Sequence, residues 1–246
     1  MIRPAFTLSA LLLAAPAAAL GSLFEFNGTA KDDNGTLLYQ ELHQVQGHCT
    51  EGVFEPVSHS VRYRDNQRED AFASKALSYE NATLRPTVEF SQPDYDEQLE
   101  IVYPDLTQLR IEWRNPSGKT ESHNVSFDER LVVDAGFDNL VRANWEKVSQ
   151  GESVAFRFLA PTRGEHYGFV LEPTANDQIN ADITLRIRPT SLVLRLLVDP
   201  IVLGYNREGA LTDYLGLTNI RKNSDENYTA HIRYDVTNYP DCELTP

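Results

Sequence analysis

The stretch of residues 191–220 constrains the fold most strongly, because it is the most apolar run downstream of the N-terminal segment. It reads SLVLRLLVDPIVLGYNREGALTDYLGLTNI. Apolar residues fall on both parities of positions 192–198, which is typical of a strand with two partly buried faces. Pro200 ends that strand, because proline has no amide hydrogen to donate to a neighbouring strand. With a second strand at 201–205 and a turn at 207–209, the stretch predicts the central hairpins of an antiparallel sheet.

Shorter segments with the same alternation recur along the rest of the chain, separated by turn signals. Asn34-Gly35 lies between two alternating runs, and this dipeptide is the strongest short-range signal for a hairpin. Residues 47–58 are expected to form a loop, and strands are expected at 60–64 and 71–80. The recurrence predicts a mainly β protein whose single antiparallel sheet is curved into a half-barrel or barrel.

One amphipathic helix is predicted among the strands, beginning after Asp134 and ending at Gly151. Aspartate commonly caps helix N-termini, and glycine commonly follows the last helical residue. Five apolar residues between them recur at helical spacing: Phe137, Leu140, Val141, Trp145 and Val148. The stripe is narrow and polar residues lie opposite it, so we expect this helix to cover one face of the sheet.

The N-terminal segment has the pattern of a secretory signal peptide, which we expect to span residues 1–19. Arg3 supplies the positive start, an apolar run follows at 6–15, and three alanines at 17–19 match a cleavage site. The apolar run is shorter than the roughly 18–20 residues needed to span a bilayer, so a membrane anchor is the weaker alternative. We expect residues 20–246 to form a single β-rich domain, exported to the periplasm and without a transmembrane segment.

The chain is strongly acidic, with a formal net charge of -14. Nucleic-acid binding requires lysine and arginine to neutralise phosphates, so this charge argues against a nucleic-acid partner. It also argues against simple electrostatic adsorption to anionic lipid, and it favours a monomer.

Only two cysteines occur, Cys49 and Cys242. In an oxidising compartment the simplest outcome is one disulfide, which would tie an early loop to the C-terminal tail. Two free thiols or a metal pair are the alternatives, since His43 and His48 lie close to Cys49 in the sequence. No second pair of ligands has the spacing of known zinc sites, so no metal site is predicted.

The sequence contains no recognised catalytic motif. It lacks a His-Glu-x-x-His pair, a Gly-x-Ser-x-Gly elbow, a dinucleotide-binding glycine pattern and a P-loop. Six histidines are scattered along it: His43, His48, His59, His123, His166 and His231. A triad could still form in space, because triads are recognised by geometry rather than by sequence position. No catalytic residue and no cofactor is assigned.

Aromatic residues and arginines on the later strands are the candidate binding residues. If the sheet curls, one of its faces becomes a concave apolar groove. We expect five residues to line this groove: Trp145, Phe156, Phe158, Tyr167 and Phe169. Arg157 or Arg195 would lie at its polar end, where a guanidinium can hold a carboxylate or phosphate. Alternatively, Trp145 only anchors the helix, and the strand arginines face solvent or pair with acidic residues on neighbouring strands.

The segment VDPIVLGYNREGALTDYLGLTNI, followed by the alternating YTAHIRYDV, resembles the C-terminal half of exported β-rich proteins of Gram-negative bacteria. It also loosely resembles the outer-membrane lipoprotein carrier proteins, through the strand at 198–205, the turn at Gly209 and the segment 214–217. The carrier resemblance implies a curved antiparallel sheet whose concave side is closed by a helix and holds acyl chains. This chain is larger and more acidic, and no functional residue of the carriers maps onto it.

These features favour a non-catalytic periplasmic protein that binds or carries a lipid or another amphipathic ligand. The first alternative is a structural or interaction module that docks a protein of the cell envelope through sheet edges or the helix face. The second alternative is a hydrolase whose site is assembled in space around the histidines.

Overall fold

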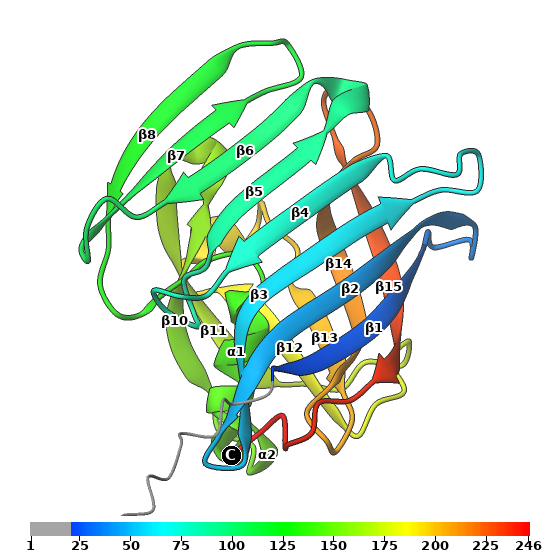
Figure 1. The fold of residues 1–246 in the computed structure, drawn as a ribbon, viewed down its shortest axis with the longest axis vertical. Helices are drawn as coiled ribbons and strands as arrows, with labels where there is room; N and C mark the ends of the chain where they lie inside the picture. The colour runs from blue at the N-terminus through cyan, green and yellow to red at the C-terminus, as the bar shows by residue number, and fades with distance from the viewer. Residues whose placement is uncertain (1–20) are drawn as a thin grey trace, which may run out of the picture.

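Residues 21–246 form one sheet that curls into an open half-barrel around two short helices (Figure 1). The structure is a computed structural model that describes these residues, and the predicted signal peptide at 1–19 lies outside them. The mainly β fold with a single curved sheet, predicted from the alternation, is confirmed. No helix within 21–246 combines the length and the apolar composition that crossing a bilayer requires.

The sheet contains fifteen strands in the order β8-β7-β6-β5-β4-β3-β2-β1-β15-β14-β13-β12-β11-β10-β9. Neighbours run antiparallel except β9 and β10, which run parallel. The strands are β1 (Ser22–Lys31), β2 (Leu37–Thr50), β3 (Val53–Arg64), β4 (Ala73–Ser78), β5 (Thr87–Gln92), β6 (Glu97–Val102), β7 (Gln108–Arg114), β8 (Thr120–Ser126), β9 (Leu131–Val132), β10 (Val154–Ala160), β11 (Glu165–Pro173), β12 (Ile183–Pro189), β13 (Ile201–Tyr205), β14 (Leu211–Arg221) and β15 (Asn227–Asn238). The helical segments are η1 (Pro93–Tyr95), α1 (Gly136–Ala143), α2 (Trp145–Ser149), η2 (Pro161–Arg163) and α3 (Leu192–Arg195).

The concave face of the sheet carries the core. In β1, Phe24 and Phe26 are buried, whereas the residues beside them along the strand are partly or fully exposed. Helices α1 and α2 occupy the concave side, where Leu140 and Val141 lie in one buried cluster with Tyr205 of β13. A sheet that has no second sheet to cover it can bury its apolar face in this way, by curling around helices.

One edge of the sheet is folded between two layers of the core. Val132 of β9 lies in the buried cluster formed with α1, whereas Leu131 on its other face lies in the cluster formed by β4–β8. Leu159 of β10 joins the second cluster as well. Side chains therefore cover both faces of the β9–β10 edge. The edge strand β9 is only two residues long, which leaves little edge for another chain to pair with.

The predicted covering helix is present but is divided in two at Asn144. The Asn144 side chain donates to Leu140 O at 2.9 Å, and such a local contact competes with continuation of the helix. The prediction that Asp134 caps the helix is wrong, because Ala135 holds the N-cap position. The Asp134 carboxylate instead forms an ion pair at 2.8 Å with Lys75 of β4.

The prediction of a strand at 192–198 is also wrong. Leu192–Arg195 forms α3, one helical turn in the loop between β12 and β13, and the apolar residues around it are exposed. The ladder of hydrogen bonds ends where Thr190 N donates to Gly168 O, and the leucine-rich segment beyond it has a high helix propensity. The remainder of the central stretch is confirmed, since β13 and β14 pair across the turn at Gly209.

The loop expected at 47–58 is replaced by the longest hairpin of the sheet. β2 continues to Thr50 and β3 begins at Val53. Glu51 and Gly52 make the turn between them, with φ values of 52° and 86°. This region lacks strong alternation of apolar and polar residues, so the strand signal was weak there.

The predicted disulfide is confirmed. Cys49, near the end of β2, is bonded to Cys242 in the C-terminal tail, and their Cα atoms are 5.9 Å apart. The tail also pairs with the sheet, because Phe54 N donates to Glu243 O at 2.8 Å, and Leu244 is buried beside it. A disulfide fits an exported protein, since cytosolic thiols are kept reduced.

Replacing both cysteines, Cys49→Ser with Cys242→Ser, should lower the free energy of unfolding by about 2–5 kcal/mol, because the cross-link restricts the unfolded chain. Urea unfolding followed by circular dichroism measures the change. Reductant should destabilise the wild-type chain to the same extent and leave the double variant unaffected. A wild-type midpoint that does not respond to reductant would contradict this role.

Candidate functional site

Four of the predicted groove residues form one aromatic patch, Phe156, Phe158, Tyr167 and Phe169, on the inner face of β10 and β11. The register pairs Phe156 with Phe169 and Phe158 with Tyr167, and paired residues of antiparallel strands point to the same face. The ring centroid of Phe156 lies 6.0 Å from that of Phe158 and 6.1 Å from that of Phe169. Phe156 is buried and the other three are half-buried, so the patch opens towards the surface.

Trp145, the fifth predicted groove residue, lies on the same side of the sheet. It begins α2, and its ring meets the ring of Tyr205 edge-on with 6.0 Å between centroids. Trp145, Phe158 and Phe169 all pack against the buried cluster that joins α1 and α2 to strands β10–β14. The structure therefore brings Trp145, Phe156, Phe158 and Phe169 to one apolar cluster, and strand parity places Tyr167 on the same face of β11.

The two predicted arginines occupy different positions. Arg157 projects from the opposite face of β10, where its Nη2 donates to His166 O at 2.8 Å and its Nε contacts His166 Nδ1. Arg195 lies in α3, where its Nε donates to Pro189 O at 2.9 Å. Pro189 is the pairing partner of Phe169, so Arg195 belongs to the loop that leaves the sheet beside the aromatic patch.

A buried polar network lies on β2, β3 and β15 and was not predicted from the sequence. His43 Nε2 lies 2.8 Å from Glu41 Oε2, and His43 Nδ1 lies 2.9 Å from His59 Nε2. Tyr234 donates its hydroxyl to the same Glu41 oxygen at 2.9 Å. These contacts satisfy a carboxylate that is almost fully buried, which is necessary for a charged group in a core.

The sequence did carry a signal for this network. Along β2 one parity is buried, and it holds Tyr39, Glu41, His43 and Val45. A polar residue at the parity of buried apolar residues points inwards with them. Burial, and secondarily the neighbouring His43, lowers the pKa of His59 well below its usual range, so the His59 ring is neutral at neutral pH.

Helix α1 is fastened to its surroundings by charged and polar contacts. Arg142 Nη2 forms an ion pair with Asp138 Oδ2 at 2.8 Å, although the two atoms are not aligned for a hydrogen bond. Arg142 Nε donates a hydrogen bond to Gly209 O at 3.0 Å. Tyr205 donates its hydroxyl to Asp138 Oδ1 at 3.0 Å. Breaking a buried ion pair costs about 3–5 kcal/mol, so these contacts fix α1 on the concave side.

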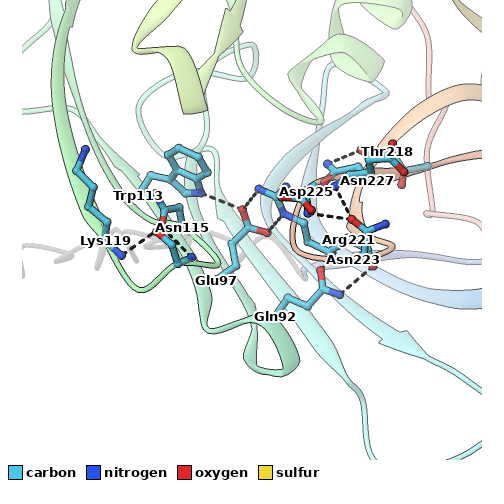
Figure 2. Close-up of polar contacts among 12 residues, drawn as sticks. Gln92, Glu97, Trp113, Asn115, Lys119, Thr218, Arg221, Asn223, Asp225 and Asn227 are labelled. Atoms are coloured by element: carbon cyan, nitrogen blue, oxygen red, sulfur yellow. Dashed lines mark hydrogen bonds and ion pairs between the residues drawn. The ribbon is translucent and has the colours of Figure 1, made fainter.

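A second polar cluster joins strands β5–β7 to β14, and Figure 2 shows its contacts. The two Glu97 oxygens at the start of β6 accept from Arg221 of β14 at 2.7 and 2.8 Å, and Trp113 donates to Glu97 Oε1 at 2.9 Å. The Gln92 side chain bonds to both the amide and the carbonyl of Arg221. This clamp, Glu97, Arg221, Trp113 and Gln92, links strands that are separated by six others in the sheet order.

Two surface hollows are polar and do not extend the aromatic patch. One of about 670 Å³ lies along β3–β8 and is lined mainly by outward-facing polar side chains, among them Arg62, Glu89 and Glu100. The other, of about 480 Å³, lies beside the clamp, between the β7–β8 and β14–β15 turns. Neither hollow is lined by a residue of the aromatic patch.

The histidines do not assemble a triad in the part of the chain that the structure describes. Their ring nitrogens contact carboxylates, an arginine, another histidine and a backbone oxygen, and none contacts a hydroxyl group. Within residues 21–246, no cluster of three histidine, cysteine, aspartate or glutamate side chains has the arrangement of a metal site.

Comparison with known proteins gives one match at the level of structure. The chain is similar to a crystal structure from Vibrio parahaemolyticus described as a "putative outer membrane lipoprotein-sorting protein domain", with 12% identity and a TM-score of 0.28. The match covers 90% of this chain and 85% of that one. The loose resemblance seen in the C-terminal segments is thus found again in the structure, and at this TM-score it adds nothing to the functional argument. No family model and no curated protein matches the chain.

Acidification should destabilise the fold through His59. The pKa of His59 is lower in the folded chain than in the unfolded chain. Below the ordinary value of 6.5 the unfolded chain therefore binds more protons, and the free energy of unfolding decreases as the pH is lowered. One such group contributes at most about 1.4 kcal/mol per pH unit. Urea unfolding between about pH 7 and about pH 5 should show a smaller pH dependence for His59→Gln.

His48→Gln is the matched control, because His48 is exposed near the end of β2 and has no part in the network. It should keep the wild-type dependence of stability on pH. A His59→Gln variant with that same dependence would show that the ring is not buried in its neutral form.

Proposed function

We propose that this chain is an exported, non-catalytic protein that binds an amphipathic molecule and holds its acyl chain on the aromatic patch. The observation that carries the proposal is the apolar surface that runs from half-buried Phe158 and Phe169 to the buried cluster beneath α1 and α2. Partly exposed aromatic rings at the margin of a core offer apolar area that a small ligand can cover. A lipid or fatty acid has the chemistry that this surface favours.

Helix α2 is the part of the cover that the acyl chain would displace. It is five residues long, and it packs on the apolar cluster through Trp145 and Val148. An acyl chain can replace such contacts at little cost, because one apolar surface substitutes for another. Helix α1 would keep its position, because Asp138 and Arg142 fasten it through polar contacts.

Arg195 is the residue that we assign to the polar head of the ligand. Its guanidinium lies in the loop next to the aromatic patch, and a guanidinium can bind a carboxylate or phosphate through two hydrogen bonds. Arg157 lies on the other face of β10, so we assign to it the orientation of His166 rather than contact with the ligand.

Fluorescence titration with dansyl-undecanoic acid tests the proposal. The wild-type protein should show a saturable increase in dansyl emission. Replacing Phe158 and Phe169 together by serine should weaken binding at least about tenfold, because two aromatic contacts contribute more than about 1.4 kcal/mol. Arg195→Gln should weaken binding of the acid and leave binding of its uncharged methyl ester unchanged.

Leu217→Ser provides the matched control, because Leu217 is an exposed apolar residue on β14, away from the aromatic patch. It should bind the probe as tightly as the wild-type protein. Circular dichroism would establish that each variant is folded. An absence of saturable binding, or equal affinities of the wild-type protein and the phenylalanine double variant, would overturn the proposal.

A further inference from the structure

The loop between β12 and β13 exposes a concentrated set of aliphatic side chains. Leu192, Val193, Leu196 and Leu197 are 75%, 67%, 87% and 74% exposed, and Val198 is also exposed. These are five of the nine large hydrophobic residues that are exposed within 21–246. Isolated exposed apolar residues are ordinary, whereas a cluster of this kind marks a surface that a membrane or another molecule covers.

This exposure is built into the fold. The loop continues the sheet through Thr190, whose N donates to Gly168 O at 2.9 Å. Arg195 Nε then donates to Pro189 O at 2.9 Å, and Val198 N donates to Leu194 O at 2.9 Å. Leu194 is half-buried on the inner side of the turn. The helical turn is therefore held in place while its apolar stripe faces outwards, the reverse of a helix that covers a core.

We infer that the α3 loop, residues 190–198, docks the protein on a phospholipid bilayer. Leu192 and Val193 lie in α3, and Leu196 and Leu197 lie in the turn that continues it, so the four side chains form a narrow projecting tip at positions i, i+1, i+4 and i+5. A protein partner would need a pocket shaped to receive this tip, whereas the acyl region of a bilayer accepts aliphatic side chains without a fixed shape. Transfer of leucine and valine side chains from water into the acyl region is favourable.

The charges at this end of the molecule fit the head-group layer. Because β10, β11 and β12 run antiparallel, the η2 turn and the α3 loop leave the sheet at the same end. Arg163 lies in η2 and Arg195 in α3, and neither forms a salt bridge with another residue of 21–246. The other three arginines of residues 154–198 are bonded elsewhere, Arg157 to His166 and both Arg186 and Arg188 to Glu172. Unpaired guanidinium groups beside an apolar tip can bind lipid phosphates while the tip inserts.

Docking at this loop goes beyond the proposed binding function and does not depend on it. Pro189, where the loop begins, pairs with Phe169 of the aromatic patch. A bilayer bound by the loop would therefore lie next to the surface that we propose for the acyl chain.

Flotation with vesicles of phosphatidylcholine, and with vesicles of phosphatidylcholine and phosphatidylglycerol, tests the inference on the full mature chain. The wild-type protein should float with both kinds of vesicle. The double variant Leu192→Asp with Leu196→Asp should lose at least about tenfold in the bound fraction at limiting lipid, because two aliphatic side chains no longer enter the acyl region.

Leu106→Asp is the matched control, because Leu106 is 90% exposed in the β6–β7 loop and lies outside the α3 loop. It should float like the wild-type protein. Phe158→Ser should also float, and the α3 double variant should still bind the uncharged methyl ester of dansyl-undecanoic acid, which does not use Arg195, so a failure of docking is distinguishable from a failure of the ligand site.

Three outcomes would overturn the inference: no flotation of the wild-type protein, unchanged flotation of the α3 double variant, or equal loss in Leu106→Asp. Sedimentation velocity without lipid addresses a second copy of the chain as the occupant. A wild-type dimer that the α3 double variant abolishes, together with absence of flotation, would assign the loop to self-association instead.

Discussion

Fifteen strands in one sheet leave a broad apolar face without a second sheet to cover it, and the curvature of the molecule follows from that constraint. The flanks approach closely enough for Glu97 to bind Arg221 across six intervening strands. The short β9 edge is folded between two core layers, and α1 and α2 fill the concave side. The aromatic patch lies at the margin of this cover, so its partial exposure is a consequence of how the sheet closes.

A charged group inside the half-barrel needs a partner, because the core excludes water. Glu41, Lys75 and Arg142 are buried, and each has a partner within the core or at its border. A buried ion pair adds little net stability, but loss of one partner strongly destabilises the fold. Such pairs therefore favour the one arrangement of helices and strands in which both partners meet. In this fold the pairs of Lys75 and Arg142 hold α1 in position, while α2 depends on the apolar contacts of Trp145 and Val148. In the function that we propose, this division lets a ligand take the place of α2 while the fold persists.

Alternation predicted the sheet, and the disulfide partners were evident from their number. Strand parity places four of the predicted groove residues on one face of β10 and β11, whereas Trp145 reaches the same cluster from α2. Arg186 and Arg188 both bind Glu172 on the neighbouring strand, which is the pairing expected of arginines on an outer face. Parity also separates Arg157 from Phe156 and Phe158, although the sequence alone does not say which parity faces inwards. Residues 192–198 were misread because a leucine-rich segment fits a buried strand and a helical turn equally well. The Glu97–Arg221 clamp joins residues 124 positions apart, and no local pattern reports such a contact.

The apolar surface from the aromatic patch to α2 is the basis of the functional account. Photo-crosslinking with a diazirine-bearing fatty acid, followed by peptide mass mapping, tests its central claim most directly because it locates the ligand. The account predicts labels concentrated in the peptides of β10, β11 and α2, and competition by unlabelled fatty acid. Labels that lie along the polar hollow of β3–β8, or that are spread evenly and resist competition, would contradict it.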